Sequence, residues 1–159
     1  MPRPVREGGE SRGRDPGHRA RSLARRLALQ AFYQIQINPR PVGDVQAQFA
    51  ADREAEGADL AYFNELLTAV AERREALDAK LAGYSEIPPN ELDPVEHAVL
   101  WLGLHELMDH PELPYRVALA EAVLLARKFG ATDGHKFVNA VLDRAARELR
   151  PLEYGQPPT

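Results

Sequence analysis

The stretch "VEHAVLWLGLHEL" (95–107) is apolar on nearly every side of a helix, and it decides the fold. A helix with this pattern is stable only when other elements cover it all round, so we expect it at the centre of the molecule. Just before it, Asp93 suits the N-cap, Pro94 the first helical position, and Glu96 the acidic position of a capping box. The stretch therefore predicts a buried helix that begins at residue 94.

The segments on either side also repeat apolar residues at helical spacing, and none alternates with the period of a strand. The predicted helices run from about 19 to "NPRP" (38–41), then over about 42–55, 59–81, 94–110, 114–129 and 133–149. The Gly- and Pro-rich segment "GYSEIPPNELDP" (83–94) separates two groups of helices. We expect an all-α helical bundle of two subdomains, with the parts 1–18 (a disordered basic arm), 19–82, 83–93 (a linker), 94–150 and 151–159 (a tail).

The charge is distributed unevenly. Residues 1–26 hold eight arginines and three acidic residues, a net charge of +5, whereas the rest of the chain carries −9. A basic arm on an acidic body suggests a polyanionic partner, although a tail that only improves solubility fits equally well.

Several functional classes lack support. Without cysteine there can be no disulfide or thiolate site, and no apolar run reaches the roughly 20 residues of a membrane span. No phosphate-binding glycine loop follows a strand, and no signal-peptide pattern is present, so we expect a cytoplasmic protein without cofactor or catalytic residues. In "HELMDH" (105–110), His105 and His110 lie five positions apart, about 140° around an ideal helix, so we expect no metal site.

One face of the first helix could bind RNA. On a helical wheel, four side chains fall within about 60° of one another, away from the apolar stripe: Arg19, Arg26, Gln30 and Tyr33. Arginine pairs with phosphate, Gln can read a base edge, and Tyr can stack on an unstacked base, which favours single-stranded RNA. The alternative is a solvated polar face with Tyr33 lying flat on the body.

The start of the last helix, "ATDGHKFVNAVLD" (131–143), is open to the same two interpretations. Asp133 is placed to cap the helix, and Phe137 falls on its apolar face. Lys136 needs no structural explanation, and the free amides of a helix N-terminus favour anions. This helix start could therefore be a simple cap or part of a surface for RNA.

Five blocks of the chain, in order, resemble the NusB family of bacterial transcription antitermination factors. They are "ARRLALQAFYQIQ" (24–36), "DLAYFNELLTAV" (59–70), "ELDPVEHAVLWLGLHEL" (91–107), "LPYRVALAEAVLLARKFG" (113–130) and "DGHKFVNAVLDRAA" (133–146). The resemblance implies a non-enzymatic protein that binds boxA RNA together with NusE, a ribosomal small-subunit protein. It also implies a role in the antitermination complex of RNA polymerase on ribosomal RNA operons.

The resemblance also implies which residues lie on or near the RNA: Arg21, Arg25, Tyr33, Glu96, Asp133, Lys136 and Phe137. Three positions depart from the family pattern, namely Trp101, His105 and Ala120, and Trp101 could be either a core residue or part of a protein interface. Two alternatives remain: a domain related to an rRNA cytosine methyltransferase, which would need a further cofactor domain, and a homodimer that masks its own RNA surface.

Overall fold

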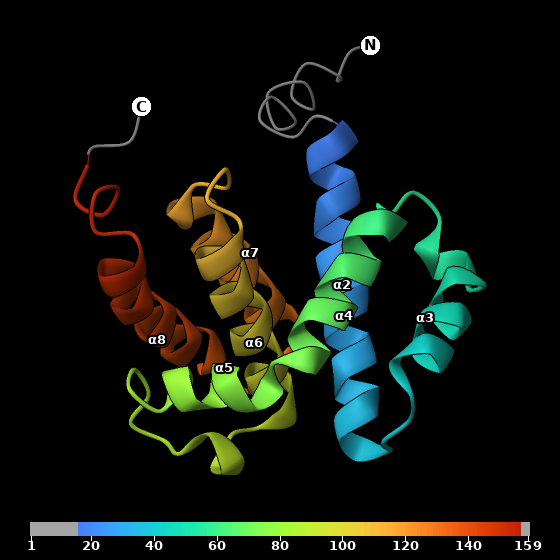
Figure 1. The fold of residues 1–159 in the computed structure, drawn as a ribbon, viewed down its shortest axis with the longest axis horizontal. Coiled ribbons are helices and arrows are strands. Elements are labelled where there is room, and N and C mark those ends of the chain that lie inside the picture. The colour runs from blue at the N-terminus through green and yellow to red at the C-terminus, as the bar shows by residue number, and fades with distance from the viewer. Residues whose placement is uncertain (1–15, 157–159) are drawn as a thin grey trace.

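The structure is a computed structural model that describes residues 16–156. The described part consists of helices and connecting segments only (Figure 1), which confirms the all-α prediction. The elements are α2 (Pro16–Ile37), α3 (Val42–Ala50), η1 (Arg53–Ala55), α4 (Leu60–Glu72), α5 (Arg74–Leu81), η2 (Pro89–Glu91), α6 (Pro94–Asp109), α7 (Tyr115–Phe129) and α8 (Gly134–Leu149).

The predicted central helix is α6. It is buried at every position from Glu96 to Leu107, and it contacts α2, α4, α5, α7 and α8. In Figure 1, α6 lies between α8 on one side and the pair α2 and α4 on the other. Asp93 caps it as predicted, because its Oδ1 accepts hydrogen bonds from the backbone N–H groups of Val95 at 2.8 Å and Glu96 at 3.4 Å.

Two predicted helices end earlier than expected. The predicted helix 59–81 is broken at Arg73, whose φ of −122° and ψ of 20° are not helical, and it continues as α5. The break lets α4 and α5 lie at different angles while both contact α6. The predicted helix 42–55 ends at Ala50, followed by the short η1.

The N-terminal prediction was partly wrong. Helix α2 already begins at Pro16, so residues 16–18 are helical and not part of a disordered arm. Residues 1–15 of the predicted basic arm lie outside the described residues. None of the described helices combines the length and the apolar character that a membrane span requires.

Trp101 is a core residue. Its side chain is 3% exposed, and its ring meets the edge of Phe32 of α2 with the centroids 5.7 Å apart. Its indole N–H donates to Asp78 Oδ1 of α5 at 2.8 Å, so the polar end of the ring is also satisfied. The core interpretation of Trp101 is therefore the one that the structure supports.

Candidate RNA-binding surface

The predicted stripe on α2 reaches the surface. Tyr33 is 43% exposed, Arg19 is exposed, and Arg26 and Gln30 are partly exposed. The apolar stripe of the same helix, which includes Ala24, Ala28 and Ala31, is fully buried. Tyr33 therefore presents part of its side chain to solvent.

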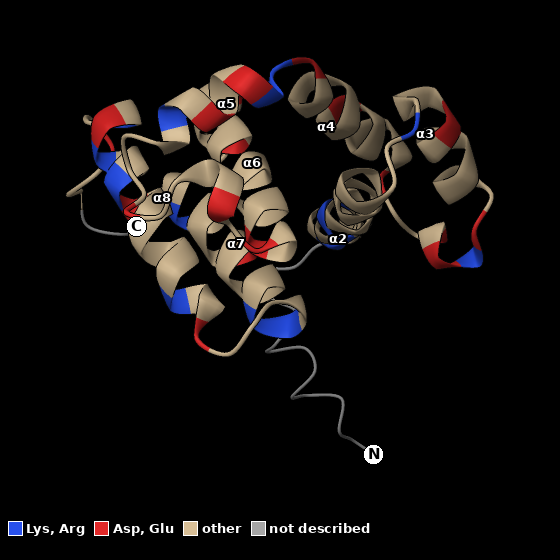
Figure 2. Ribbon diagram, turned by 90° about the horizontal axis from the view of Figure 1, so that it is seen from below, with Lys and Arg blue, Asp and Glu red and all other residues tan. Residues whose placement is uncertain are grey.

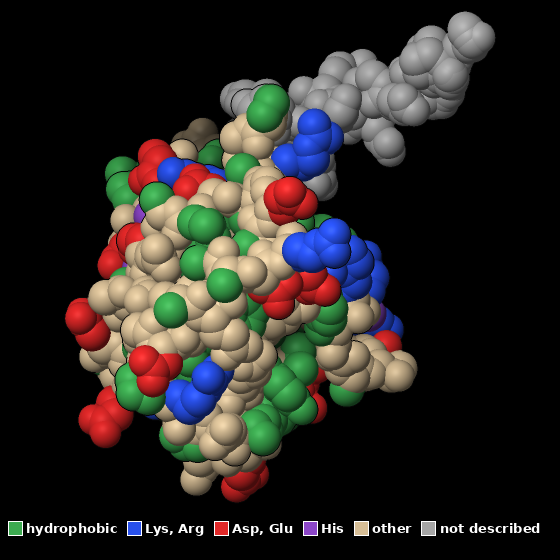
Figure 3. Space-filling model, turned by 90° about the vertical axis from the view of Figure 1, so that its right-hand side faces the viewer, with side chains coloured by type: hydrophobic (Ala, Val, Ile, Leu, Met, Phe, Trp, Pro, Cys, Tyr) green, Lys and Arg blue, Asp and Glu red, His purple; other side chains and the backbone are tan. Residues whose placement is uncertain are grey.

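A groove of about 600 Å³ runs beside this stripe. Gln30 and Tyr33 of α2 line one side of the groove, and Gln48 and Phe49 of α3 line another. The remaining lining residues include Val95, Phe129, Asp52 and Glu54. Figure 3 shows this side of the molecule, where exposed hydrophobic side chains adjoin basic and acidic ones. The groove thus offers apolar walls and amide groups, which suit a nucleobase better than a phosphate.

The acidic residues of the groove come from the segment after α3, which is coloured red on both sides of a basic position in Figure 2. The basic residues of the stripe come from α2. Arg19 and Arg26 do not line the groove, whose charged lining residues are Asp52 and Glu54, so a polyanionic backbone would follow α2 outside the groove.

Phe129 connects the α2 stripe to the start of α8. The guanidinium carbon of Arg26 lies 5.6 Å from the centroid of the Phe129 ring, and the chain runs from Phe129 through residues 130–133 into α8. The two regions that the sequence predicted separately are therefore neighbours in the fold.

Glu96 anchors the segment before α8 and does not form the predicted capping box. Its side chain is buried, and Oε2 accepts the N–H of Ala131 at 3.0 Å. A Cβ at Gly134 would lie only 2.1 Å from that oxygen, so only glycine allows this close approach. Burial raises the pKa of the Glu96 carboxyl, an effect that the hydrogen bond from Ala131 opposes. Glu96 thus supports the α8 start from inside and offers little surface to an RNA.

Asp133 precedes α8 but does not cap it through its side chain, so the predicted cap was wrong. Its backbone is left-handed, with a φ of 66°, and its carboxylate makes no hydrogen bond to the helix start. Instead it lies 3.4 Å from the Lys136 ammonium, and both side chains are mostly exposed. Phe137 is half-buried and packs against the core. Asp133 and Lys136 are therefore free to meet a ligand at the helix N-terminus.

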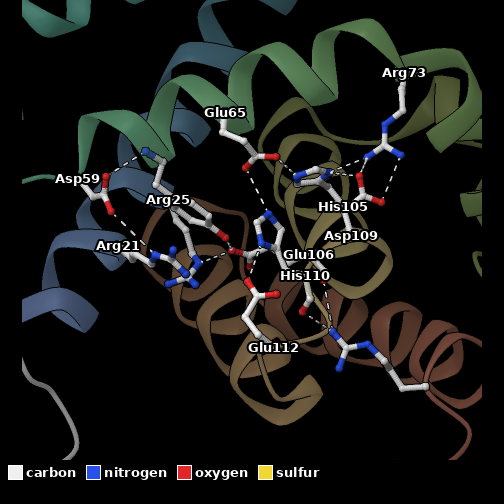
Figure 4. A network of polar contacts seen from close by, with 12 residues as sticks. Arg21, Arg25, Asp59, Glu65, Arg73, His105, Glu106, Asp109, His110 and Glu112 are labelled. Atoms are coloured by element: carbon white, nitrogen blue, oxygen red, sulfur yellow. Dashed lines mark hydrogen bonds and ion pairs between the residues drawn. The ribbon is translucent and has the colours of Figure 1, made fainter.

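Arg25 lies inside the protein, unlike its neighbour Arg26. It is 3% exposed, and its Nε donates to Glu106 Oε2 of α6 at 2.7 Å (Figure 4). Its Nη1 lies 3.3 Å from Glu121 of α7 but makes no well-directed hydrogen bond. Burial alone would lower the pKa of Arg25, but the charge of Glu106 and its hydrogen bond raise the pKa above the usual value. The position of Arg25 indicates a structural role and leaves it no access to RNA.

Arg21 is partly exposed and lies at the edge of the same network. Its guanidinium carbon lies 4.4 Å from the centroid of the Tyr62 ring, and its Nε lies 3.8 Å from Asp59. Tyr62 also donates its hydroxyl to Glu106, and burial together with that carboxylate raises the pKa of Tyr62. Arg21 can still reach a phosphate, because its pairing with Asp59 is loose and solvent-exposed.

The model of the NusB family matches residues 22–147, which is most of the chain. The chain belongs to the NusB family. It is 44% identical to the transcription antitermination protein NusB of Shewanella sediminis over 124 residues, covering 78% of this chain and 92% of that protein. It is also 45% identical to the protein of that name from Nitrosococcus oceani, covering 84% of this chain and 90% of that protein.

Two solved structures share the NusB fold with this chain. NusB of T. maritima aligns with a TM-score of 0.70 at 24% identity, covering 80% of this chain and 90% of that one. A structure of the antitermination factors NusB and NusE in complex with dsRNA aligns with a TM-score of 0.69 at 21% identity, covering 82% and 98%. These likenesses confirm the predicted NusB-like fold.

Some important polar residues escaped the sequence analysis. Glu106 and Glu121 are buried partners of Arg25, and Arg150 is a buried arginine that donates to the backbone oxygens of Leu107 and His110, both at 2.9 Å. One feature of the sequence could have predicted the buried pairing of Glu106. It lies inside a mainly apolar helix, where a charged residue requires a buried partner.

The predicted separation of His105 and His110 by about 140° around one helix is wrong. Helix α6 ends at Asp109, and His110 has a φ of −120° and a ψ of 70°, so the ideal-helix angle does not apply to it. The rings of His105 and His110 lie with their centroids 5.2 Å apart, and both contact Glu65.

Proposed function

We propose that this NusB-family protein is an antitermination factor that binds boxA-containing single-stranded RNA together with NusE. The observation that carries the proposal is the exposed Tyr33 ring beside the groove, in line with Arg26 and Gln30, on a chain of this family. The complex would act on RNA polymerase in the cytoplasm during transcription of ribosomal RNA operons.

Each part of the surface has a chemical task in this proposal. Tyr33 stacks on one base, Gln30 hydrogen-bonds to a base edge in the groove, and Arg19, Arg21 and Arg26 pair with phosphates along α2. This arrangement reads unstacked bases, which a duplex would keep inside its stack.

The start of α8 binds the continuing backbone. The exposed Lys136 ammonium, at the positive end of the α8 dipole, favours a phosphate, and the half-buried Phe137 supports the surface from the core side. The Asp133 carboxylate opposes this binding, and it is held beside Lys136. Arg25 and Glu96 act indirectly, because their side chains position α2 and the segment before α8.

The names of known relatives support the partner. The curated relatives are called transcription antitermination proteins, and the solved complex contains NusB with NusE and dsRNA. We propose NusE as the protein partner of this chain on that basis.

The test is fluorescence anisotropy with a labelled boxA-like RNA and a scrambled RNA of equal length, each with and without NusE. We expect the boxA-like RNA to bind more tightly than the scrambled one, and NusE to increase the preference. A duplex form of the same RNA should bind more weakly. Equal binding of all RNAs would contradict the proposal, and loss of RNA binding as the protein dimerises in sedimentation would favour the masked homodimer.

A further inference from the structure

A cluster of metal-binding side chains lies where α4 meets the end of α6. It contains Glu65 of α4, His105 of α6 and His110, which follows α6 directly (Figure 4). The Nε2 of His105 lies 3.0 Å from Glu65 Oε2, and the Nε2 of His110 lies 3.2 Å from Glu65 Oε1. Each residue offers one ligand atom, and the three atoms all lie within 4.8 Å of one another.

We propose that Glu65, His105 and His110 bind one divalent transition-metal ion, with Zn²⁺ as the ion best matched to the site. Two imidazole nitrogens and one carboxylate oxygen are ligands that zinc uses, with a fourth position left for water. Ligand atoms of a tetrahedral zinc site lie about 3.3–3.5 Å apart, because the bonds are about 2.0–2.1 Å long. The longest separation, up to 4.8 Å, must therefore shorten by as much as about 1.4 Å, and the 42% exposed side chain of Glu65 can rotate to bring its oxygen closer to the ring nitrogens.

Carboxylates also face the outer nitrogens of both rings. Glu112 Oε2 lies 2.9 Å from His110 Nδ1, and Asp109 Oδ2 lies 3.6 Å from His105 Nδ1. Histidines that bind metals usually direct their second nitrogen to a carboxylate or carbonyl oxygen, which fixes the ring and increases its basicity. His110 has this arrangement, whereas His105 has Asp109 within ion-pair distance but hydrogen-bonds through Nδ1 to Arg73.

The charge of the cluster also favours a cation. With neutral rings, the carboxylates of Glu65, Asp109 and Glu112 give −3 and the guanidinium of Arg73 gives +1, a net charge of −2. A divalent ion would balance that charge, whereas the metal-free cluster relies on Arg73 and on ring protons.

The protein holds the two rings in place. His105 is fully buried. The backbone oxygen of His110 accepts a hydrogen bond from Arg150 at 2.9 Å, and its ring meets the edge of Tyr62 with the centroids 5.4 Å apart. The two nitrogen ligands are therefore positioned before the ion arrives, which reduces the ordering needed on binding.

Arg73 competes with the ion. Its Nη2 lies 2.6 Å from His105 Nδ1, so in the metal-free protein Nδ1 accepts this bond and Nε2 keeps the proton that it donates to Glu65. When the ion binds Nε2, the proton moves to Nδ1, which then donates to Asp109. Arg73 keeps its separate ion pair with Asp109 at 3.0 Å.

Bound zinc would connect α4 to the end of α6, and so fasten the two groups of helices together. The test uses the full-length chain without a tag, stripped with a chelator and titrated with ZnCl₂ by calorimetry, with thermal unfolding followed in parallel. We expect one ion per chain and a rise in Tm of about 5–10 °C at 100 times the Kd. Magnesium, which prefers oxygen ligands, should produce neither effect.

Variants separate this site from adventitious zinc binding. Glu65→Gln and His110→Gln each remove a ligand and should weaken zinc binding by at least about tenfold, which reduces the rise in Tm to about half or less. Glu112→Gln should weaken zinc binding by about 10-fold. The matched control is His135→Gln, which removes a histidine at the start of α8 and should bind zinc as the wild type does. Arg73→Gln should bind zinc more tightly, because the competing guanidinium is gone.

The proposal is overturned if the wild type binds zinc no more tightly than Glu65→Gln and His110→Gln do. It is equally overturned if His135→Gln loses the ion as they do. These results do not depend on RNA, so the zinc site and the proposed RNA function can fail separately.

Discussion

Replacing Arg25 with Met should destabilise the protein without touching its RNA surface. The variant leaves Glu106, which is 1% exposed, and Glu121, which is 6% exposed, without the cation between them. Breaking a buried ion pair from one side costs about 3–5 kcal/mol. Each carboxylate keeps a hydroxyl donor, Tyr62 for Glu106 and Ser22 for Glu121, so we expect the lower end of that range, about 3 kcal/mol.

That loss corresponds to a fall in Tm of about 6–12 °C for a chain of this size. Arg25→Lys keeps the charge but cannot form the directed Nε bond to Glu106, and should lose about 1–2 kcal/mol. The double variant Arg25→Met with Glu106→Gln should lose less stability than the sum of the two single variants. With position 106 neutral, the absence of Arg25 no longer leaves that carboxylate buried and unpaired.

The assay pairs urea unfolding with RNA titration at a temperature where all variants are folded. The matched control is Arg26→Met, which changes the adjacent, solvent-facing arginine. It should alter the free energy of unfolding by less than about 0.5 kcal/mol while weakening RNA binding. If Arg25→Met kept its stability and lost RNA affinity instead, the structural role assigned to Arg25 would be refuted.

Three further predictions concern the RNA surface and its support. Tyr33→Ala should weaken RNA binding by about 1–3 kcal/mol in anisotropy titrations, and Tyr33→Phe should bind nearly as the wild type does; equal losses would contradict stacking. Asp133→Asn should bind RNA roughly two- to fivefold more tightly at low salt, with a gain that shrinks in a salt series, because a carboxylate near a phosphate costs about 0.5–1 kcal/mol. Gly134→Ala should lose about 1–3 kcal/mol in urea unfolding, since its Cβ would meet Glu96, whereas Gly43→Ala has open space and should be neutral or stabilising.

The parts of the fold that follow from local pattern were predictable. The all-round apolar character of α6 indicated a central helix, and the spacing of Arg26, Gln30 and Tyr33 indicated an exposed stripe. Both features depend only on helical periodicity, which the sequence carries directly. The break at Arg73 was not predictable in the same way, because it depends on how α4 and α5 both reach α6.

Whether an individual polar residue is buried or exposed depends on partners that are distant in sequence. Arg25 and Arg26 are adjacent and identical, yet Arg25 pairs with Glu106, 81 positions away, whereas Arg26 is partly exposed and lies near the Phe129 ring. Glu96 likewise stands at the acidic position of a capping box. Its carboxylate instead accepts a hydrogen bond from the N–H of Ala131, which is distant in sequence. A resemblance to a family shows which positions correspond along the chain. It does not show where the side chain at each position points.

Ideal helix geometry does not apply to the residues at helix ends. His110 was placed by an ideal angle that holds inside a helix, but it lies one residue beyond α6. Asp133 was given the usual conformation of a capping residue, but its left-handed backbone turns the carboxylate toward Lys136. Termini are the least predictable parts of helices, and here they carry the chemistry.

The position of α6 has a consequence for synthesis on the ribosome. Helices α2, α4 and α5 leave the ribosome first, but the faces that they turn toward α6 stay uncovered until residues 94–109 have also emerged. The first half of the chain therefore cannot complete a core while the second half is being translated. Until α6 has emerged, the nascent chain exposes apolar surface that chaperones can bind.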